Sequence, residues 1–151
     1  MYTKGEFAKR VDDLEMSIMS CILIKPELME QVLLEDKYFV KHQRMWQFMK
    51  AFYKKFGTFD TNLMYSVCKD KFQIIEYITL LLEIEPDGHN FEKYQKQLVE
   101  LYEENKKDKW IKEKVYQLAN YLYVGGISTQ KFKEGVEAIY IRVDEIYGKE
   151  E

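Results

Sequence analysis

The residues that most often carry catalytic chemistry are scarce and scattered in this chain. The only Gly-Lys pair, Gly148-Lys149, is followed by Glu150, where a phosphate-binding loop requires Ser or Thr. Val143 stands where that loop requires its leading Gly. Because such a loop cradles the phosphates and supplies a hydroxyl to Mg²⁺, we expect this chain not to hydrolyse ATP. We predict no catalytic residues and no cofactor.

The potential metal ligands are equally dispersed. His42 and His89 are the only histidines, and neither has a Cys or a second His at the spacing of a metal site. Cys21 and Cys68 lie among apolar residues, as buried free thiols do. We therefore predict no metal site, and we expect His42 to make a local hydrogen bond near the start of a helix.

A basic run in the second half of the chain is the candidate for contact with nucleic acid. It contains Lys106, Lys107, Lys109 and Trp110, and surfaces that bind single strands combine such charges with aromatic rings that stack on bases. Acidic residues interleave with the lysines, among them Asp108, which is typical of ion pairs on the solvent side of a helix. The net charge of −3 also differs from that of most nucleic-acid-binding domains. These features argue against direct DNA binding.

Composition and periodicity together predict an all-α protein. Hydrophobic residues make up 46% of the 151 residues, enough for a buried core, while only 2 Pro and 7 Gly argue against a turn-rich β fold. The first residues lack the apolar core of a signal peptide, and no apolar run approaches the roughly 18 residues of a membrane span. We therefore expect a cytoplasmic protein without membrane contact.

Residues 1–104 are predicted to form a small globule of about six helices. Asp12 or Asp13 can cap the first of these helices, because their side chains accept hydrogen bonds from free amides at a helix start. A later apolar stripe stops at Gly57, which is a natural C-terminal cap. Asp60 is then placed to cap the following helix.

Residues 105–151 are predicted to form a long antiparallel helical hairpin. Two apolar stripes at coiled-coil spacing flank a Gly125-Gly126 loop, and Ser128 or Thr129 can start the last helix. A two-helix hairpin has little core of its own, so its apolar residues need a further surface, either the globule or a second hairpin. The predicted interface residues are Ile111, Val115, Leu118, Leu122, Phe132, Val136, Ile139, Val143 and Ile146.

Short motifs in the first part of the chain occur in a characteristic order. Glu15 precedes the apolar run Ile18–Leu23, which contains Ser20, and the aromatic pair Tyr38-Phe39 is followed by His42. In order and spacing this resembles the N-terminal domain of the DnaB-type replicative DNA helicases of bacteria and phages. That pattern usually has Gly where this chain has Ser20.

The likeness extends along most of the chain. Gly57–Asp60 is similar to the family's Gly-x-Pro-Ile-Asp turn, with Thr-Phe in place of Pro-Ile. Asn90, Tyr94 and Val99-Glu100 resemble the end of the family's globular domain, and the segment from Lys107 to Tyr147 looks like its linker hairpin. The resemblance implies six helices in a globule and a hairpin that pairs with other hairpins.

The resemblance also implies a role in DNA replication without catalysis. In that family the domain builds a ring above an ATP-driven motor ring, and it is the tier where primase docks and loaders act. No motor occurs within these 151 residues. We therefore expect a module that forms a homodimer or larger homo-oligomer and recruits helicase, primase or helicase loader. It would act as the N-terminal part of a longer helicase or as a free-standing protein.

Two alternative functions are consistent with the same residues. The first is a phage-encoded adaptor or inhibitor that binds the host helicase, loader or primase. The second is a single-stranded DNA-binding accessory protein, which would use the basic run from Lys106 to Trp110.

Overall fold

The computed structural model describes residues 4–147, and every regular element in that range is helical. The all-α fold class is therefore confirmed. The chain divides into two compact units, Met1–Leu101 and Tyr102–Glu151. The division falls within one continuous helix of 33 residues, α5 (Phe91–Tyr123). The boundary proposed from the sequence at residue 104 lies in this same helix.

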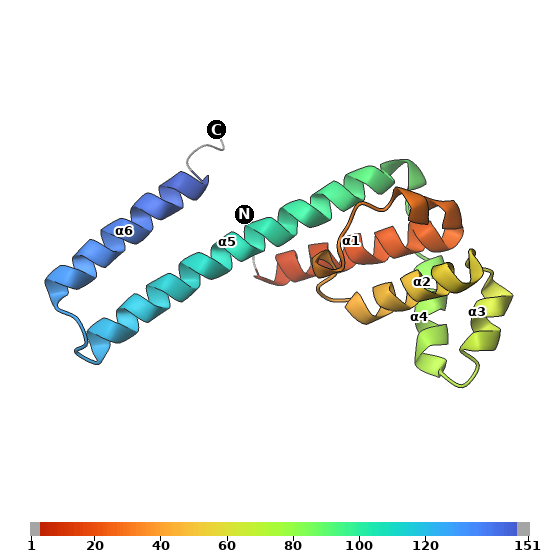
Figure 1. Ribbon diagram of the computed structural model, residues 1–151, viewed down its shortest axis with the longest axis horizontal. Helices are drawn as coiled ribbons and strands as arrows, with labels where there is room; N and C mark the ends of the chain where they lie inside the picture. The colour runs from red at the N-terminus through yellow and green to blue at the C-terminus, as the bar shows by residue number, and fades with distance from the viewer. Residues whose placement is uncertain (1–3, 148–151) are drawn as a thin grey trace. The chain divides into compact units, whose positions relative to one another are not determined.

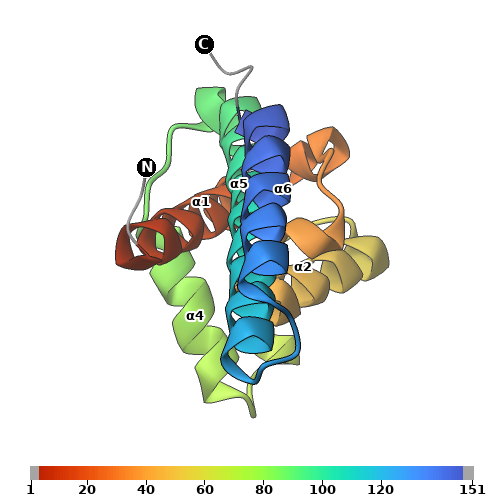
Figure 2. The same ribbon diagram turned by 90° about the vertical axis from the view of Figure 1, so that its left-hand side faces the viewer.

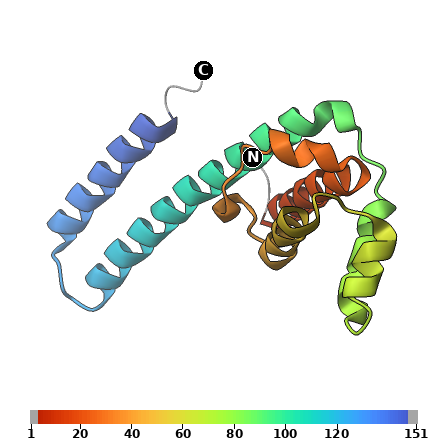
Figure 3. The same cartoon turned by 45° about the vertical axis from the view of Figure 1, so that its right-hand side comes forward.

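The first unit consists of short and medium helices joined by 3₁₀ turns (Figure 1). Before α5 it contains α1 (Lys4–Ile24), η1 (Pro26–Gln31), η2 (Asp36–Tyr38), α2 (Gln43–Phe56), α3 (Thr61–Val67), α4 (Phe72–Leu82) and η3 (Gly88–Asn90). α3 and α4 lie side by side (Figure 3), where the Tyr65 and Thr79 hydroxyls are 3.3 Å apart. α1 lies along the first turns of α5 (Figure 1), and Arg10 Nη2 donates to Gln97 Oε1 there at 3.0 Å.

Helix α1 starts earlier than its sequence predicts. It begins at Lys4, so Asp12 and Asp13 lie inside the helix and the prediction of a cap there is wrong. Phe7 and Val11 explain the difference, because they continue the apolar stripe towards the N-terminus at helical spacing and pack on the core. Burial of about two additional turns favours helix where the charged residues alone suggest a start.

Other helix ends follow the local rules of capping. Gly57 ends α2 in the left-handed conformation with φ of 68°, and its amide donates to the Tyr53 carbonyl oxygen at 2.7 Å. Asp60 Oδ1 accepts from the amide of Leu63 at 2.9 Å, and so caps α3. Both predicted caps are confirmed.

The core of the first unit includes a stacked aromatic pair at the approach to α2. The rings of Phe39 and Trp46 lie parallel with centroids 4.3 Å apart, and neither side chain is exposed. Trp46 Nε1 donates to Asp36 Oδ1 at 3.1 Å, so the buried indole N–H is satisfied. Lys50 donates to the same carboxylate and is the main reason that the pKa of Asp36 lies below its ordinary value.

The second unit is the helical hairpin. It contains the rest of α5 and α6 (Thr129–Tyr147), which run side by side in Figures 1 and 2. Ser128 Oγ accepts from the amide of Lys131 at 3.1 Å, which confirms it as the cap of α6. Gly135 permits close approach of the helices, because a Cβ there would come within 2.7 Å of the Leu118 side chain. Near the other end, Tyr147 donates to Asp108 Oδ1 at 2.7 Å.

The length and the apolar character of a helix decide whether it can span a membrane. Within residues 4–147, no helix combines the length and the apolar character needed to cross a bilayer.

Ser20 gives the first testable prediction. Its side chain is fully buried, and its hydroxyl donates at 2.5 Å to the carbonyl oxygen of Leu81, in the last turn of α4. Ser20→Ala removes this bond and leaves the Leu81 carbonyl oxygen with the longer 3.3 Å bond from the Ile84 amide, so we expect the free energy of unfolding to fall by about 1 kcal/mol. Chemical denaturation monitored by circular dichroism measures the change.

Ser66→Ala is the matched control, because Ser66 lies exposed on α3. We expect it to change stability by less than about 0.5 kcal/mol. Equal effects of the two substitutions would show that the link between α1 and α4 contributes nothing measurable.

Candidate interaction surfaces

A buried carboxylate on α1 accepts hydrogen bonds from the backbone at the start of α2. Glu15 is 0% exposed, and its Oε1 accepts from the amides of Lys41 at 3.2 Å and His42 at 3.0 Å. Amides that precede the first full turn of a helix have no partners within it, and they favour a negative charge. Burial raises the pKa of Glu15 above its ordinary value, while the two amides oppose part of that rise.

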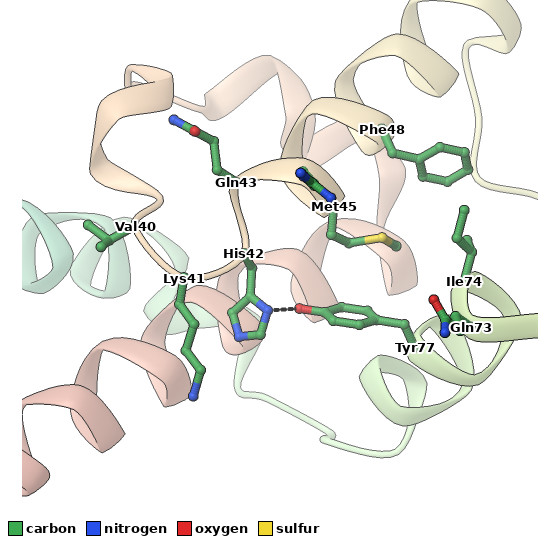
Figure 4. A pocket seen from close by; sticks show the side chains of 10 residues that line it. Val40, Lys41, His42, Gln43, Met45, Phe48, Gln73, Ile74 and Tyr77 are labelled. Carbon is green, nitrogen blue, oxygen red and sulfur yellow. Dashed lines mark hydrogen bonds between the residues drawn. The ribbon is translucent and has the colours of Figure 1, made fainter.

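His42 connects the start of α2 to both α1 and α4, and with Glu15, Asp12 and Tyr77 it forms a polar junction. Its Nε2 lies 2.5 Å from Asp12 Oδ1 on α1, and its Nδ1 is hydrogen-bonded to the hydroxyl of Tyr77 (Figure 4). Burial, with Asp12 and Glu15 close by, raises the pKa of Tyr77, so the phenol keeps its proton. Both ring nitrogens of His42 are therefore engaged, one with a carboxylate on α1 and one with a phenol on α4.

The sequence placed His42 correctly but not its partners. A local hydrogen bond was expected, whereas Asp12 and Tyr77 are 30 and 35 residues away in the chain. Asp12 precedes Glu15 by one helical turn, which is a signal that both carboxylates share a face of α1. Nothing in the sequence pairs Tyr77 with this face.

A groove of about 590 Å³ lies beside this junction. Figure 4 shows its two walls, the start of α2 on one side and α4 on the other. The residues that line it are Val40, Lys41, His42, Gln43, Arg44, Met45, Phe48, Gln73, Ile74 and Tyr77. They include two cations and no carboxylate. No pattern in the sequence indicates this groove, because its walls come from separate parts of the chain.

The predicted interface residues of the hairpin are all incompletely buried. Val115 and Val136 are 51% and 45% exposed. The others are half-buried: Ile111, Leu118, Leu122, Phe132, Ile139, Val143 and Ile146. Large apolar side chains beside the stripes are also exposed, including Tyr123 at 91% and Tyr140 at 72%. A substantial apolar surface therefore remains uncovered on the hairpin, and its role as an interface stays a prediction.

The basic run does not form one uniform surface. Lys106 and Lys109 are exposed, whereas Lys107 and Trp110 are half-buried. Lys107 Nζ lies over the ring of Tyr147, 5.6 Å from its centroid. One of the three lysines therefore takes part in packing within the hairpin.

The two cysteines are both buried free thiols. Burial raises the pKa of Cys21 to about 11, and it also raises the pKa of Cys68. Both groups therefore stay protonated near neutral pH and are poor nucleophiles and metal ligands. Among residues 4–147, His, Cys, Asp and Glu side chains do not gather in groups of three or more that could hold a metal ion.

The raised pKa of Glu15 predicts how stability depends on pH. The contribution of such a group is fully present below its ordinary pKa of 4.5 and is lost as the pH rises through the higher value of the folded state. Glu15→Gln removes this titration. We therefore expect the wild type to gain stability relative to Glu15→Gln as the pH falls from 7 towards 4.5, measured by denaturant unfolding at each pH.

Glu15→Gln also replaces one acceptor oxygen by an NH₂ group, so we expect it to cost about 1–3 kcal/mol at pH 7. Asp13→Asn is the matched control, because Asp13 lies on the same helix and is exposed. A stability difference between wild type and Glu15→Gln that is constant across this pH range would contradict the prediction.

The chain matches a known protein family. The family model of the DnaB-like helicase N terminal domain aligns with residues 9–100, which is more than half of the 151 residues and includes α2, α3, α4 and the part of α1 from residue 9 onward. No curated protein and no solved structure matches significantly. The matched segment contains Glu15 and His42, which carried the resemblance and which form the junction described above. The chain therefore belongs to the family of DnaB-like helicase N-terminal domains.

Proposed function

We propose that this chain is a non-catalytic assembly and recruitment module of a replicative helicase. Membership in the family associates it with a replicative helicase, and the family's domain is itself non-catalytic. The observation that carries the proposal is the combination of that match with a hairpin whose apolar stripes lack full burial. The module acts either as the N-terminal part of a longer helicase or as a free-standing protein.

Assembly is the first part of this function. The first unit encloses large side chains such as Trp46 and Ile18 completely, whereas none of the nine stripe residues of the hairpin is fully buried. Uncovered apolar surface of this extent is a feature of interaction sites. A second hairpin offers the same stripes and the same exposed tyrosines, so two copies form a symmetric, mainly apolar interface. A homodimer is the simplest product and the building block of a larger ring.

Recruitment is the second part. Helicase, primase and helicase loader are the partners that a domain of this family serves, and contact is made through protein surfaces. Direct DNA binding is not part of the function, because the net charge is −3 and Lys107 is used within the hairpin. A phage-encoded adaptor that binds the host's helicase, loader or primase is the alternative form of this function, and it likewise acts through protein contacts.

Sedimentation tests the assembly step. We expect the wild type to sediment as a dimer or larger species, and Val136→Asp with Val143→Asp to dissociate it, because a buried unpaired charge is costly. The affinity should fall by at least about tenfold. Ala138→Asp is the matched control: it adds a charge to an exposed position on α6 that is not in the stripe, and it should leave the assembly intact. A wild type that stays monomeric at high micromolar concentration would refute assembly through the hairpin.

Pull-down with purified proteins tests recruitment. The chain is immobilised and offered helicase, primase and helicase loader one at a time, and we expect at least one to be retained at physiological salt. The assembly-deficient double variant separates the two functions, since a partner held by the first unit is still retained, with lower avidity. Retention of none of the three would contradict the recruitment proposal and leave assembly as the function.

A further inference from the structure

The groove beside α2 combines an apolar floor with an open edge. Met45 and Phe48 from α2 and Ile74 from α4 supply apolar surface, and Figure 4 shows these side chains on the two facing walls. Val40 stands at the entrance and is 65% exposed. The groove therefore offers apolar surface both on its floor and at Val40, which solvent reaches.

The charges around this groove have one sign. Lys41 and Arg44 line it, and no Asp or Glu does. Lys41 Nζ lies 3.5 Å from Asp12, whereas the guanidinium of Arg44 has no carboxylate partner among residues 4–147. The amides of Gln43 and Gln73 add neutral hydrogen-bond donors. An anionic group placed here meets positive charge on the α2 wall and the Gln73 amide on the α4 wall.

Helix α2, which supplies one wall of the groove, carries further positive charge, although Lys50 and Lys54 line a separate hollow. α2 contains no acidic residue, and Arg44, Lys50, Lys54 and Lys55 are all exposed on it. Lys50 is paired with Asp36, but Lys54 has no ion pair within the described part of the chain. This concentration of positive charge is local, because the whole chain has a net charge of −3.

The groove is held open by the polar junction behind it. The amides of Lys41 and His42 are fixed by Glu15, and His42 is fixed by Asp12 and Tyr77. Residues 41 and 42 form one wall of the groove and Tyr77 forms part of the other. A ligand therefore meets a preformed surface and spends little free energy on ordering it.

We propose that this groove docks an acidic peptide segment of a partner protein, with apolar side chains as anchors. The floor takes one or two side chains such as Leu, Ile or Phe, while Asp and Glu residues of the segment face Arg44 and Lys41. The proposal rests on the recruitment function and specifies the chemistry of the segment that is recruited. Charge complementarity selects an acidic segment, and the apolar floor requires anchor residues beside its charges.

Single-stranded nucleic acid fits this groove less well. Its bases need exposed aromatic faces, but Phe48 and Tyr77 are both half-buried, and the Tyr77 hydroxyl is bonded to His42. The aliphatic side chains of Val40 and Ile74 offer no ring for stacking. An oligonucleotide therefore serves as the competing ligand in the test.

Selection from a displayed library of random dodecapeptides against the full chain tests the proposal. We expect the selected pool to be enriched in Asp and Glu together with Leu, Ile or Phe. Fluorescence anisotropy with one selected peptide should show at least about tenfold weaker binding to Arg44→Glu, and about threefold weaker binding to Val40→Ser. Lys93→Glu is the matched control, because Lys93 is exposed on α5 and does not line the groove, and we expect it to bind as the wild type does.

Arg44 and Val40 are both exposed, so these variants should keep the wild-type unfolding transition, which circular dichroism checks. A pool without acidic enrichment, or selected peptides that bind Arg44→Glu as tightly as the wild type, would overturn the proposal. Displacement of the peptide by oligo(dT) at equal concentration would also overturn it in favour of nucleic acid. These outcomes leave the sedimentation of the hairpin unchanged, so failure here is distinguishable from failure of the assembly function.

Discussion

The burial of the Glu15 carboxylate against the start of α2 determines much of the first unit. Burying a carboxylate away from water costs free energy unless hydrogen bonds replace its hydration. Here the amides of Lys41 and His42 supply those hydrogen bonds. These bonds fix where the chain enters α2 relative to α1. His42 is then directed to Asp12 on α1 and to Tyr77 on α4. One polar junction thus joins three helices, and the walls of the groove follow from it.

The two units satisfy their apolar residues in different ways. In the first unit the side chains of Leu14, Ile18 and Trp46 are at most 2% exposed, so the core is complete within one copy. In the hairpin the stripes face each other, yet Val115 and Val136 remain about half exposed. Two helices cannot enclose a core as a globule can, because each contacts only one neighbour. The first unit is thus suited to fold and present a surface, and the hairpin is suited to associate.

Features set by local sequence were predicted well, and features set by distant contacts were not. Gly57, Asp60 and Ser128 were identified as caps because a cap depends on a few neighbouring residues. The start of α1 was misplaced because Phe7 and Val11 extend the helix through packing on the core. The groove was missed because its walls come from residues 40–48 and 73–77, which only the fold brings together. Helical periodicity predicts which face of each segment is buried, but it does not show that these two segments lie next to each other.

The placement of the two proposed surfaces has a consequence for recruitment. The stripes of the hairpin are mainly apolar and self-complementary, which suits contact between identical copies. The groove combines Arg44 and Lys41 with apolar residues, and such a surface repels its own copy and suits a partner of opposite charge. Each copy has one groove, so the proposed assembly through the hairpin would multiply the docking sites. A peptide segment that binds one groove weakly would then be held firmly when its parent protein presents several segments to one assembly. The two proposals are thus linked, because assembly would strengthen recruitment without any change in the groove itself.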